Sequence, residues 1–130
     1  MINKIGVLTS GGDAPGMNAA IRGVTRYAIQ KGLTVEGIIR GYEGLLSHET
    51  RPLGRRDVGA IIHRGGTMLR TARCLEFKEK ETQKKAAAYL RELEIDALVV
   101  VGGDGSMRGA QALSRWGIPT ITIPRSEERR

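Results

Sequence analysis

Two glycine-rich loops hold the residues of this sequence that are best suited to chemistry. The first occupies residues 9–18 (TSGGDAPGMN) and the second residues 102–106 (GGDGS). Glycines let backbone N–H groups approach phosphate oxygens, and the N-terminus of a following helix adds partial positive charge. Neither loop has the Walker pattern or the dinucleotide-binding pattern with its acidic partner. One such loop is often only a tight turn, but two at the same edge of a sheet favour a phosphate-binding site.

Asp104 stands between glycines at the end of an apolar run. Removing a carboxylate from water at this position costs free energy unless the carboxylate meets a cation or caps a helix. A Mg²⁺ ion bridged to phosphates would use it, because Mg²⁺ prefers one or two carboxylates together with phosphate oxygens and water. The competing interpretation is an N-cap of a helix that starts near Ser106. The spacing alone leaves both interpretations open.

Three arginines and the single cysteine are further candidates. Arg73 follows a glycine-led segment and could clamp a phosphate and offset the charge of a transferring phosphoryl group, although a surface arginine is the plain alternative. Arg22 and Arg26 are four residues apart on a predicted helix. They would repel each other unless an anion joined them, but a solvated face is the more frequent explanation of such a pair. Cys74 has no obvious activating base, so we interpret it as a packing or ligand-lining residue.

Strand and helix patterns alternate along the chain. The predicted strands are 4–9, 33–39, 96–101 and 120–123, and the predicted helices are 18–31, 57–63, 79–93 and 107–115. Residues 41–44 (GYEG) predict a turn-rich loop. This alternation indicates an α/β fold, a three-layer domain with a mainly parallel sheet.

The composition narrows the function classes. The chain has 21 Lys and Arg against 14 Asp and Glu, and its formal net charge of +7 suits nucleic acid, an acidic membrane surface or small phosphorylated ligands. Its few aromatic residues are not interleaved with basic ones, as they are in proteins that bind single strands. One cysteine excludes an intrachain disulfide, and no apolar run approaches the ~20 residues of a membrane span. We expect a cytoplasmic protein that binds neither nucleic acid nor membrane.

Four segments together resemble the bacterial ATP-dependent 6-phosphofructokinases. They are IGVLTSGGDAPGMNAAIRG at 5–23, GYEGL at 41–45, RGGTMLRTAR at 64–73 and VVVGGDGS at 99–106. Four separated motifs in the family's order are far more specific than a lone glycine loop, and the likeness runs from the start to about residue 124. The resemblance implies a phosphofructokinase-like fold. It also implies phosphoryl transfer from MgATP to fructose 6-phosphate, a step of glycolysis that gives fructose 1,6-bisphosphate.

The resemblance assigns roles to individual residues. The positions that contact ATP in the family match Gly12, Arg73, Cys74, Gly103, Asp104, Gly105 and Ser106. By the same resemblance Asp104 holds Mg²⁺, and Gly12 and Arg73 stabilise the transferring group. Gly105 favours ATP as the donor, because pyrophosphate-dependent relatives tend to carry an Asp at that position.

A second site follows from the resemblance. Arg22, Arg26 and Arg55 match arginines of an allosteric site at a subunit interface. In the family this site takes ADP as activator or phosphoenolpyruvate as inhibitor, and the full-length enzyme is a homotetramer. The suspicion that Arg22 and Arg26 share an anion thereby gains support.

The end of the sequence departs from the family. Family members continue the last strand into a Pro-Gly-Thr-Ile-Asp-Asn-Asp-like segment, whose first Asp is the general base for the sugar 1-hydroxyl. This chain instead has RSEERR at 125–130. We therefore expect an incomplete ATP-binding domain at 1–124, a divergent polar tail at 125–130, and neither the general base nor the sugar-phosphate domain. The activity of such a truncated chain is left open.

Two other functions stay open at this point. One is a non-catalytic nucleotide-binding or regulatory fragment that associates with a full-length enzyme. The other is a relative of the NAD or lipid kinases, which also use a Gly-Gly-Asp-Gly loop. The latter explains residues 102–106 but neither residues 11–18 nor residues 64–73.

Overall fold

A five-stranded sheet with the order β3-β2-β1-β4-β5 organises the protein. The computed structural model describes residues 2–11, 16–59, 67–71, 77 and 79–124. The strands are β1 (Lys4–Thr9), β2 (Thr34–Ile38), β3 (Thr50–Leu53), β4 (Ala97–Gly102) and β5 (Thr120–Pro124). Four of them run parallel, and β3 alone pairs antiparallel, along β2. The predicted mainly parallel sheet is confirmed.

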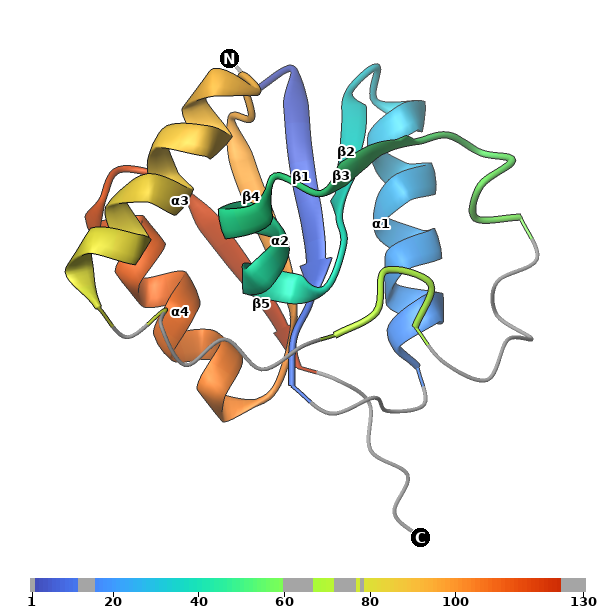
Figure 1. Ribbon diagram of the computed structural model, residues 1–130. Coiled ribbons are helices and arrows are strands. Elements are labelled where there is room, and N and C mark those ends of the chain that lie inside the picture. Colours follow the sequence, from blue (N-terminus) through green and yellow to red (C-terminus); the bar gives the residue numbers. More distant parts are fainter. Residues whose placement is uncertain (1, 12–15, 60–66, 72–76, 78, 125–130) are drawn as a thin grey trace, which may run out of the picture.

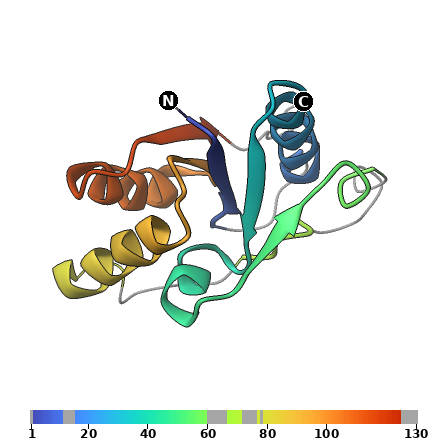
Figure 2. The same cartoon turned by 90° about the horizontal axis from the view of Figure 1, so that it is seen from above.

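Helices cover both faces of this sheet. They are α1 (Met17–Gln30), α2 (Gly41–Ser47), α3 (Lys80–Glu92) and α4 (Asp104–Arg115). Figures 1 and 2 show α1 on one face and α3 with α4 on the other, so the predicted three-layer arrangement is confirmed. Among the described residues, no helix combines the length and the apolarity that crossing a bilayer requires.

Alternate side chains of the central strands enter two separate cores. Val7 of β1 and Val99 of β4 join one apolar cluster with α1, whereas Leu8 and Leu98 join the other with α3 and α4. All four are buried. Burial on both faces explains why these strands read as continuous apolar runs rather than alternating ones.

The predicted turn-rich loop at 41–44 is wrong, because these residues begin helix α2. Gly41 and Gly44 have low helix propensity, and for that reason the sequence pattern predicted a turn. Tertiary packing overrides that preference, since Tyr42 and Leu45 are 6% and 1% exposed within the core on the side of α3.

Strand β3 and the turn after it also differ from expectation. Residues 57–59 form a turn instead of starting the predicted helix 57–63, and residues 60–63 lie outside the described residues. The Asp57 carboxylate holds this turn by accepting hydrogen bonds from the Gly54 N–H at 2.6 Å and the Arg51 guanidinium at 2.7 Å. No strand was predicted at 50–53, where Pro52 lowers strand propensity. Proline is tolerated there because β3 is an edge strand.

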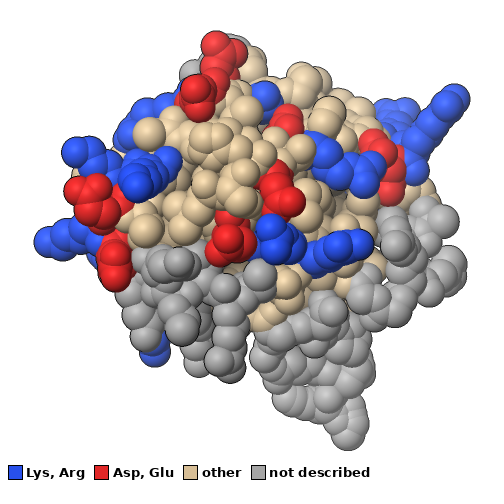
Figure 3. All heavy atoms as spheres, viewed as in Figure 1, with Lys and Arg blue, Asp and Glu red and all other residues tan. Residues whose placement is uncertain are grey.

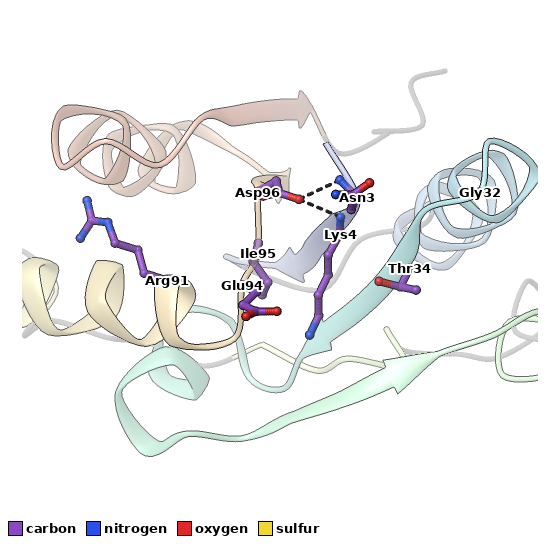
Figure 4. Close-up of a pocket in the computed structure, with 8 residues that line it drawn as sticks. All are labelled: Asn3, Lys4, Gly32, Thr34, Arg91, Glu94, Ile95 and Asp96. Atoms are coloured by element: carbon purple, nitrogen blue, oxygen red, sulfur yellow. Dashed lines mark hydrogen bonds between the residues drawn. The ribbon is translucent and has the colours of Figure 1, made fainter. Parts of the chain in front are cut away.

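The amino edge of the sheet carries a surface hollow of about 680 Å³. Figure 4 shows Asp96 there, with its carboxylate accepting hydrogen bonds from the backbone N–H groups of Asn3 at 2.7 Å and Lys4 at 3.0 Å. The Lys4 ammonium donates in turn to the carbonyl of Leu93 at 2.9 Å. These contacts bind the start of β1 to the start of β4, so we interpret this edge as structural.

Leu98→Ala should lower the free energy of unfolding by about 2–5 kcal/mol, because Leu98 is fully buried between β4 and the α3/α4 layer. Ile121→Ala is the matched control, since Ile121 is 58% exposed on β5. It should cost less than about 1 kcal/mol. Urea denaturation followed by circular dichroism measures both. Similar losses in the two variants would contradict the two-core packing.

Asp96→Ala should lower stability at neutral pH but not in strong acid. The two backbone hydrogen bonds hold the pKa of Asp96 below its ordinary value of 3.8. The unfolded chain therefore takes up this proton first, and the stabilisation is present above the ordinary value and is lost as pH falls through the lowered pKa. Urea midpoints of wild type and variant, measured from pH 7 downward, should converge in acid. A gap that stays constant with pH would refute this role.

Candidate functional site

The two glycine-rich loops meet at the carboxyl edge of the sheet. Thr9 is in register with Val101, and the N–H of Ser10 donates to the Val101 carbonyl at 2.9 Å. Gly102 leaves room for this contact. A Cβ on Gly102 would come within 2.6 Å of the Ser10 carbonyl oxygen and would overlap the Ser106 hydroxyl. Any larger residue at 102 would separate the ends of the two loops.

Two helix N-termini open at this same edge. Helix α1 follows Gly16, which has a φ of 94°, and α4 follows Gly103. Neither helix has a side-chain hydrogen bond at its N-cap. The first turn of a helix leaves N–H groups without intrahelical partners and carries partial positive charge. This edge therefore offers backbone donors to an anion.

A buried chain of hydroxyl groups ties a turn at 67–71 to the end of β1. Thr9 donates from Oγ1 to the carbonyl of Arg70 at 3.0 Å. With the Thr9 proton so used, the 3.1 Å contact between the two threonine hydroxyls has Thr67 as its donor. Both threonines are buried, at 0% and 8% exposure. Such a satisfied buried network fixes the turn to the sheet edge.

The other end of the first loop holds the same turn. The Asn18 side-chain carbonyl, in the first turn of α1, accepts from the Met68 N–H at 2.8 Å. The N–H of Arg40, just before α2, donates to the Leu69 carbonyl at 2.7 Å. The described part of the third motif, residues 67–71, is therefore held beside the two ends of the first glycine loop by contacts with β1, α1 and the residue before α2.

The structure places the predicted nucleotide residues only in part. Gly12, Arg73 and Cys74 lie outside the described residues, as does the side chain of Asp104. By its backbone Asp104 is the first helical residue of α4 and Gly103 is the N-cap, so the N-cap interpretation of Asp104 is wrong. The helix starts three residues before the predicted 107, which puts all of the GDGS sequence after Gly102 at the N-terminus of α4 beside the first loop.

Ser106 is buried at 3% exposure in the first turn of α4. Its hydroxyl has no hydrogen-bond partner among the described residues. A buried hydroxyl without a partner is costly. Its place at the meeting point of the two loops makes it a candidate ligand contact.

The arginines of the predicted second site lie on the α1 side of the sheet. Arg22 is half-buried and its Nε has no hydrogen-bond partner within the described part of the chain, while Arg26 is exposed. Arg55 is exposed in the turn after β3. Val58 of that turn is buried in the same apolar cluster as Ile21 of α1, so the turn packs on the α1 layer.

Surface charge does not single out a polyanion-binding face in the view of Figure 3. Over the described residues of that face, Lys and Arg alternate with Asp and Glu instead of forming one basic patch. The net charge of +7 is spread over the chain. This face therefore gives nucleic-acid binding no support.

Residues that sequence reasoning missed hold the site together. Tyr42 is buried in α2 and donates from its hydroxyl to the carbonyl of Ser106 at 2.6 Å. Thr9 and Thr67 form the hydroxyl chain at the end of β1. A tyrosine inside a glycine-rich segment and a threonine ending a buried strand were the available signals. Neither residue's partner can be read from its neighbours, because the contacts span 64 and 58 residues.

Curated relatives match almost the whole chain. A family model described as Phosphofructokinase matches residues 4–128. The ATP-dependent 6-phosphofructokinase 1 of Clostridium perfringens is 57% identical over 123 residues, and the ATP-dependent 6-phosphofructokinase of Caldanaerobacter subterraneus is 61% identical over 124. Each match covers 95% of this chain but 39% of the relative's length. Because these relatives are named as kinases, they do not favour the regulatory-fragment alternative.

Solved structures agree with the fold. Pichia pastoris phosphofructokinase in the T-state superimposes with a TM-score of 0.89 at 38% identity, over 97% of this chain and 15% of that one. A pyrophosphate-dependent phosphofructokinase from Marinobacter aquaeolei gives a TM-score of 0.75 at 22% identity, over 95% of this chain and 33% of that one. The second likeness shows the fold alone.

Thr9→Val should lower the free energy of unfolding by about 1–3 kcal/mol, because it removes the buried hydroxyl that donates to the Arg70 carbonyl and contacts the Thr67 hydroxyl. Amides of residues 67–71 should also exchange faster with deuterated solvent. Thr122→Val is the matched control, since Thr122 is exposed on β5. If both variants lose equal stability and the turn keeps its protection, the hydroxyl chain does not hold the turn.

Proposed function

Since this chain belongs to the phosphofructokinase family, we propose that it forms the nucleotide-binding part of an ATP-dependent 6-phosphofructokinase. The reaction is transfer of the terminal phosphoryl group of ATP to fructose 6-phosphate. One observation carries the proposal: two glycine loops, each leading into an uncapped helix N-terminus, meet through Ser10 and Val101. The chain spans 39% of the length of the relatives that it matches, so the activity and substrates of the whole protein are part of the proposal.

Residues 1–124 form the proposed ATP-binding domain. Triphosphate oxygens would accept from backbone N–H groups of the two loops and of the first turns of α1 and α4. Such donors are held by the fold and need little reorganisation when an anion arrives. Gly12 in the first loop and Gly103, Gly105 and Ser106 in the second are the proposed contacts, with Cys74 lining the nucleotide site.

Asp104 is the proposed metal residue. A Mg²⁺ ion held there would offset the negative charge of the phosphates. The fold suits such a group. The backbone places Asp104 at the start of α4, beside loops that offer donors to phosphate and beside a Ser106 hydroxyl that lacks a partner among the described residues. One carboxylate next to bound phosphates is the ligand set that Mg²⁺ prefers.

Gly12 and Arg73 are the proposed catalytic groups. The Gly12 N–H and the Arg73 guanidinium would stabilise charge on the phosphoryl group as it moves, which is the main task of a protein in phosphoryl transfer. The turn at 67–71, which ends two residues before Arg73 in the sequence, is fixed by Thr9 and Asn18. No residue of this chain is assigned to sugar binding or to proton removal from the sugar.

The proposed donor is ATP rather than pyrophosphate. Gly105 supports this choice, because the family resemblance places an Asp at this position in pyrophosphate-dependent enzymes. The relatives at 57% and 61% identity are named ATP-dependent.

The proposed location is the cytoplasm, because a single cysteine fits a reducing compartment.

A second anion site is proposed at Arg22, Arg26 and Arg55, for ADP or phosphoenolpyruvate at a subunit interface of a homotetramer. The Nε of the half-buried Arg22 is itself buried without a described partner, which supports an anion there because a buried N–H donor needs an acceptor. Arg26 lies one helical turn further on α1, on the same face. The turn that carries Arg55 packs on the α1 layer.

ATP titrated calorimetrically into the purified protein should bind more tightly with Mg²⁺ than without it. Asp104→Ala should weaken the Mg²⁺-dependent binding by about 10- to 100-fold, the usual effect of losing a charged contact. Asp96→Ala is the matched control, because it removes the same side chain at the opposite end of β4. At neutral pH it should leave nucleotide affinity unchanged.

Two outcomes would reject parts of this proposal. Absence of ATP binding by a folded protein would reject the nucleotide function itself. Equal weakening by Asp104→Ala and Asp96→Ala would reject the metal role of Asp104 while keeping the nucleotide function.

A further inference from the structure

Tyr42 links two elements that the sequence keeps far apart. It lies in α2 and its hydroxyl donates to the carbonyl of Ser106, in the first turn of α4, at 2.6 Å. A helix carbonyl has two lone pairs, so it can accept from the tyrosine in addition to its own helix. The bond is buried, and buried hydrogen bonds of this length are strong and directional.

The ring of Tyr42 is held as firmly as its hydroxyl. It stacks on Phe77, with ring centroids 4.4 Å apart and planes inclined by 21°. It also lies against Gly109, where an added Cβ would come within 2.5 Å of the ring carbon Cζ and 2.8 Å of the hydroxyl oxygen. Ser106 and Gly109 are three residues apart and share one face of α4. The tyrosine therefore contacts the first turns of α4 at two points.

The hydroxyl keeps its donor role over the whole working range of pH. Burial raises the pKa of Tyr42 above its ordinary value of 10.0.

Arg40, two residues before Tyr42, donates from its backbone N–H to the Leu69 carbonyl. The start of α2 thus holds the 67–71 turn with one residue and α4 with another.

We infer that Tyr42 is a positioning residue for the nucleotide loop. It holds the first turn of α4 through the Ser106 carbonyl, and thereby aims the backbone amides that precede Ser106 in this loop at the phosphates. The inference rests on the proposed nucleotide-binding function. Tyr42 acts through Ser106 and need not touch the ligand. The hydrogen bond matters because it orders the helix N-terminus before the ligand arrives. The entropic cost of that ordering is then not part of the binding free energy.

Tyr42→Phe tests the hydroxyl alone, because phenylalanine keeps the stacking on Phe77 and the contact with Gly109. We expect MgATP to bind about 3- to 10-fold more weakly by calorimetry, the range set by loss of one hydrogen bond. Without nucleotide, amides at 106–110 should exchange about 3- to 10-fold faster, while those of β4 stay unchanged. Both are measured where circular dichroism shows the variant folded, so a general loss of stability would not move the affinity.

Tyr89→Phe is the matched control. Tyr89 is also buried, and its hydroxyl lies 3.4 Å from the Thr50 hydroxyl, remote from the start of α4. This variant should leave both the affinity and the exchange at 106–110 as in wild type.

The outcomes distinguish the positioning role of Tyr42 from the proposed nucleotide-binding function. Weaker binding and faster exchange in Tyr42→Phe alone support the positioning role. Wild-type affinity in a folded Tyr42→Phe, or an equal loss in Tyr89→Phe, overturns it and leaves the proposed function standing. A wild-type protein that binds no MgATP rejects the proposed function, and the positioning role falls with it.

Discussion

The parallel pairing of β1 with β4 is the constraint on which the site depends. It sets Thr9 opposite Val101, and the next backbone bond, from Ser10 to the Val101 carbonyl, lies at the point where both loops begin. Both strands are buried on both faces, so a slip of one residue would send a whole set of side chains into the wrong layer. The register therefore fixes where both glycine loops and both helix N-termini begin.

Much of the fold could be predicted because β1 and β4 are continuous apolar runs bounded by glycines. Such runs carry their own signal, and the helices α1 and α3 carry theirs in their apolar stripes. The segments that were missed lack a local signal. Helix α2 has two glycines in seven residues and depends on burying Tyr42 and Leu45. Strand β3 has only four residues and exists through its pairing with β2.

The sequence predicts a chemistry for the candidate site but does not identify the residues that hold the site in place. Glycines, an acid and an arginine predict a phosphate site by their types and spacing. The groups that hold those residues in place are ordinary by type: a threonine ending a strand, an asparagine starting a helix, a tyrosine in a short helix. Their roles come from partners such as Arg70 for Thr9 and Ser106 for Tyr42, which lie 61 and 64 residues away. Long-range hydrogen bonds of this kind leave no periodic trace in a sequence.

The two edges of the sheet differ in a way that decides where an anion can bind. Helices that follow parallel strands place their N-termini at the carboxyl edge and their C-termini at the amino edge, so the first edge carries partial positive charge and the second partial negative charge. At the amino edge Lys4 donates to the Leu93 carbonyl and Asp96 accepts two backbone N–H groups, so these polar groups already have partners. At the carboxyl edge α1 and α4 begin without side-chain caps. Of the two aspartates at opposite ends of β4, Asp96 binds backbone N–H groups at the amino edge, whereas Asp104 begins α4 at the carboxyl edge, where the phosphate site is proposed.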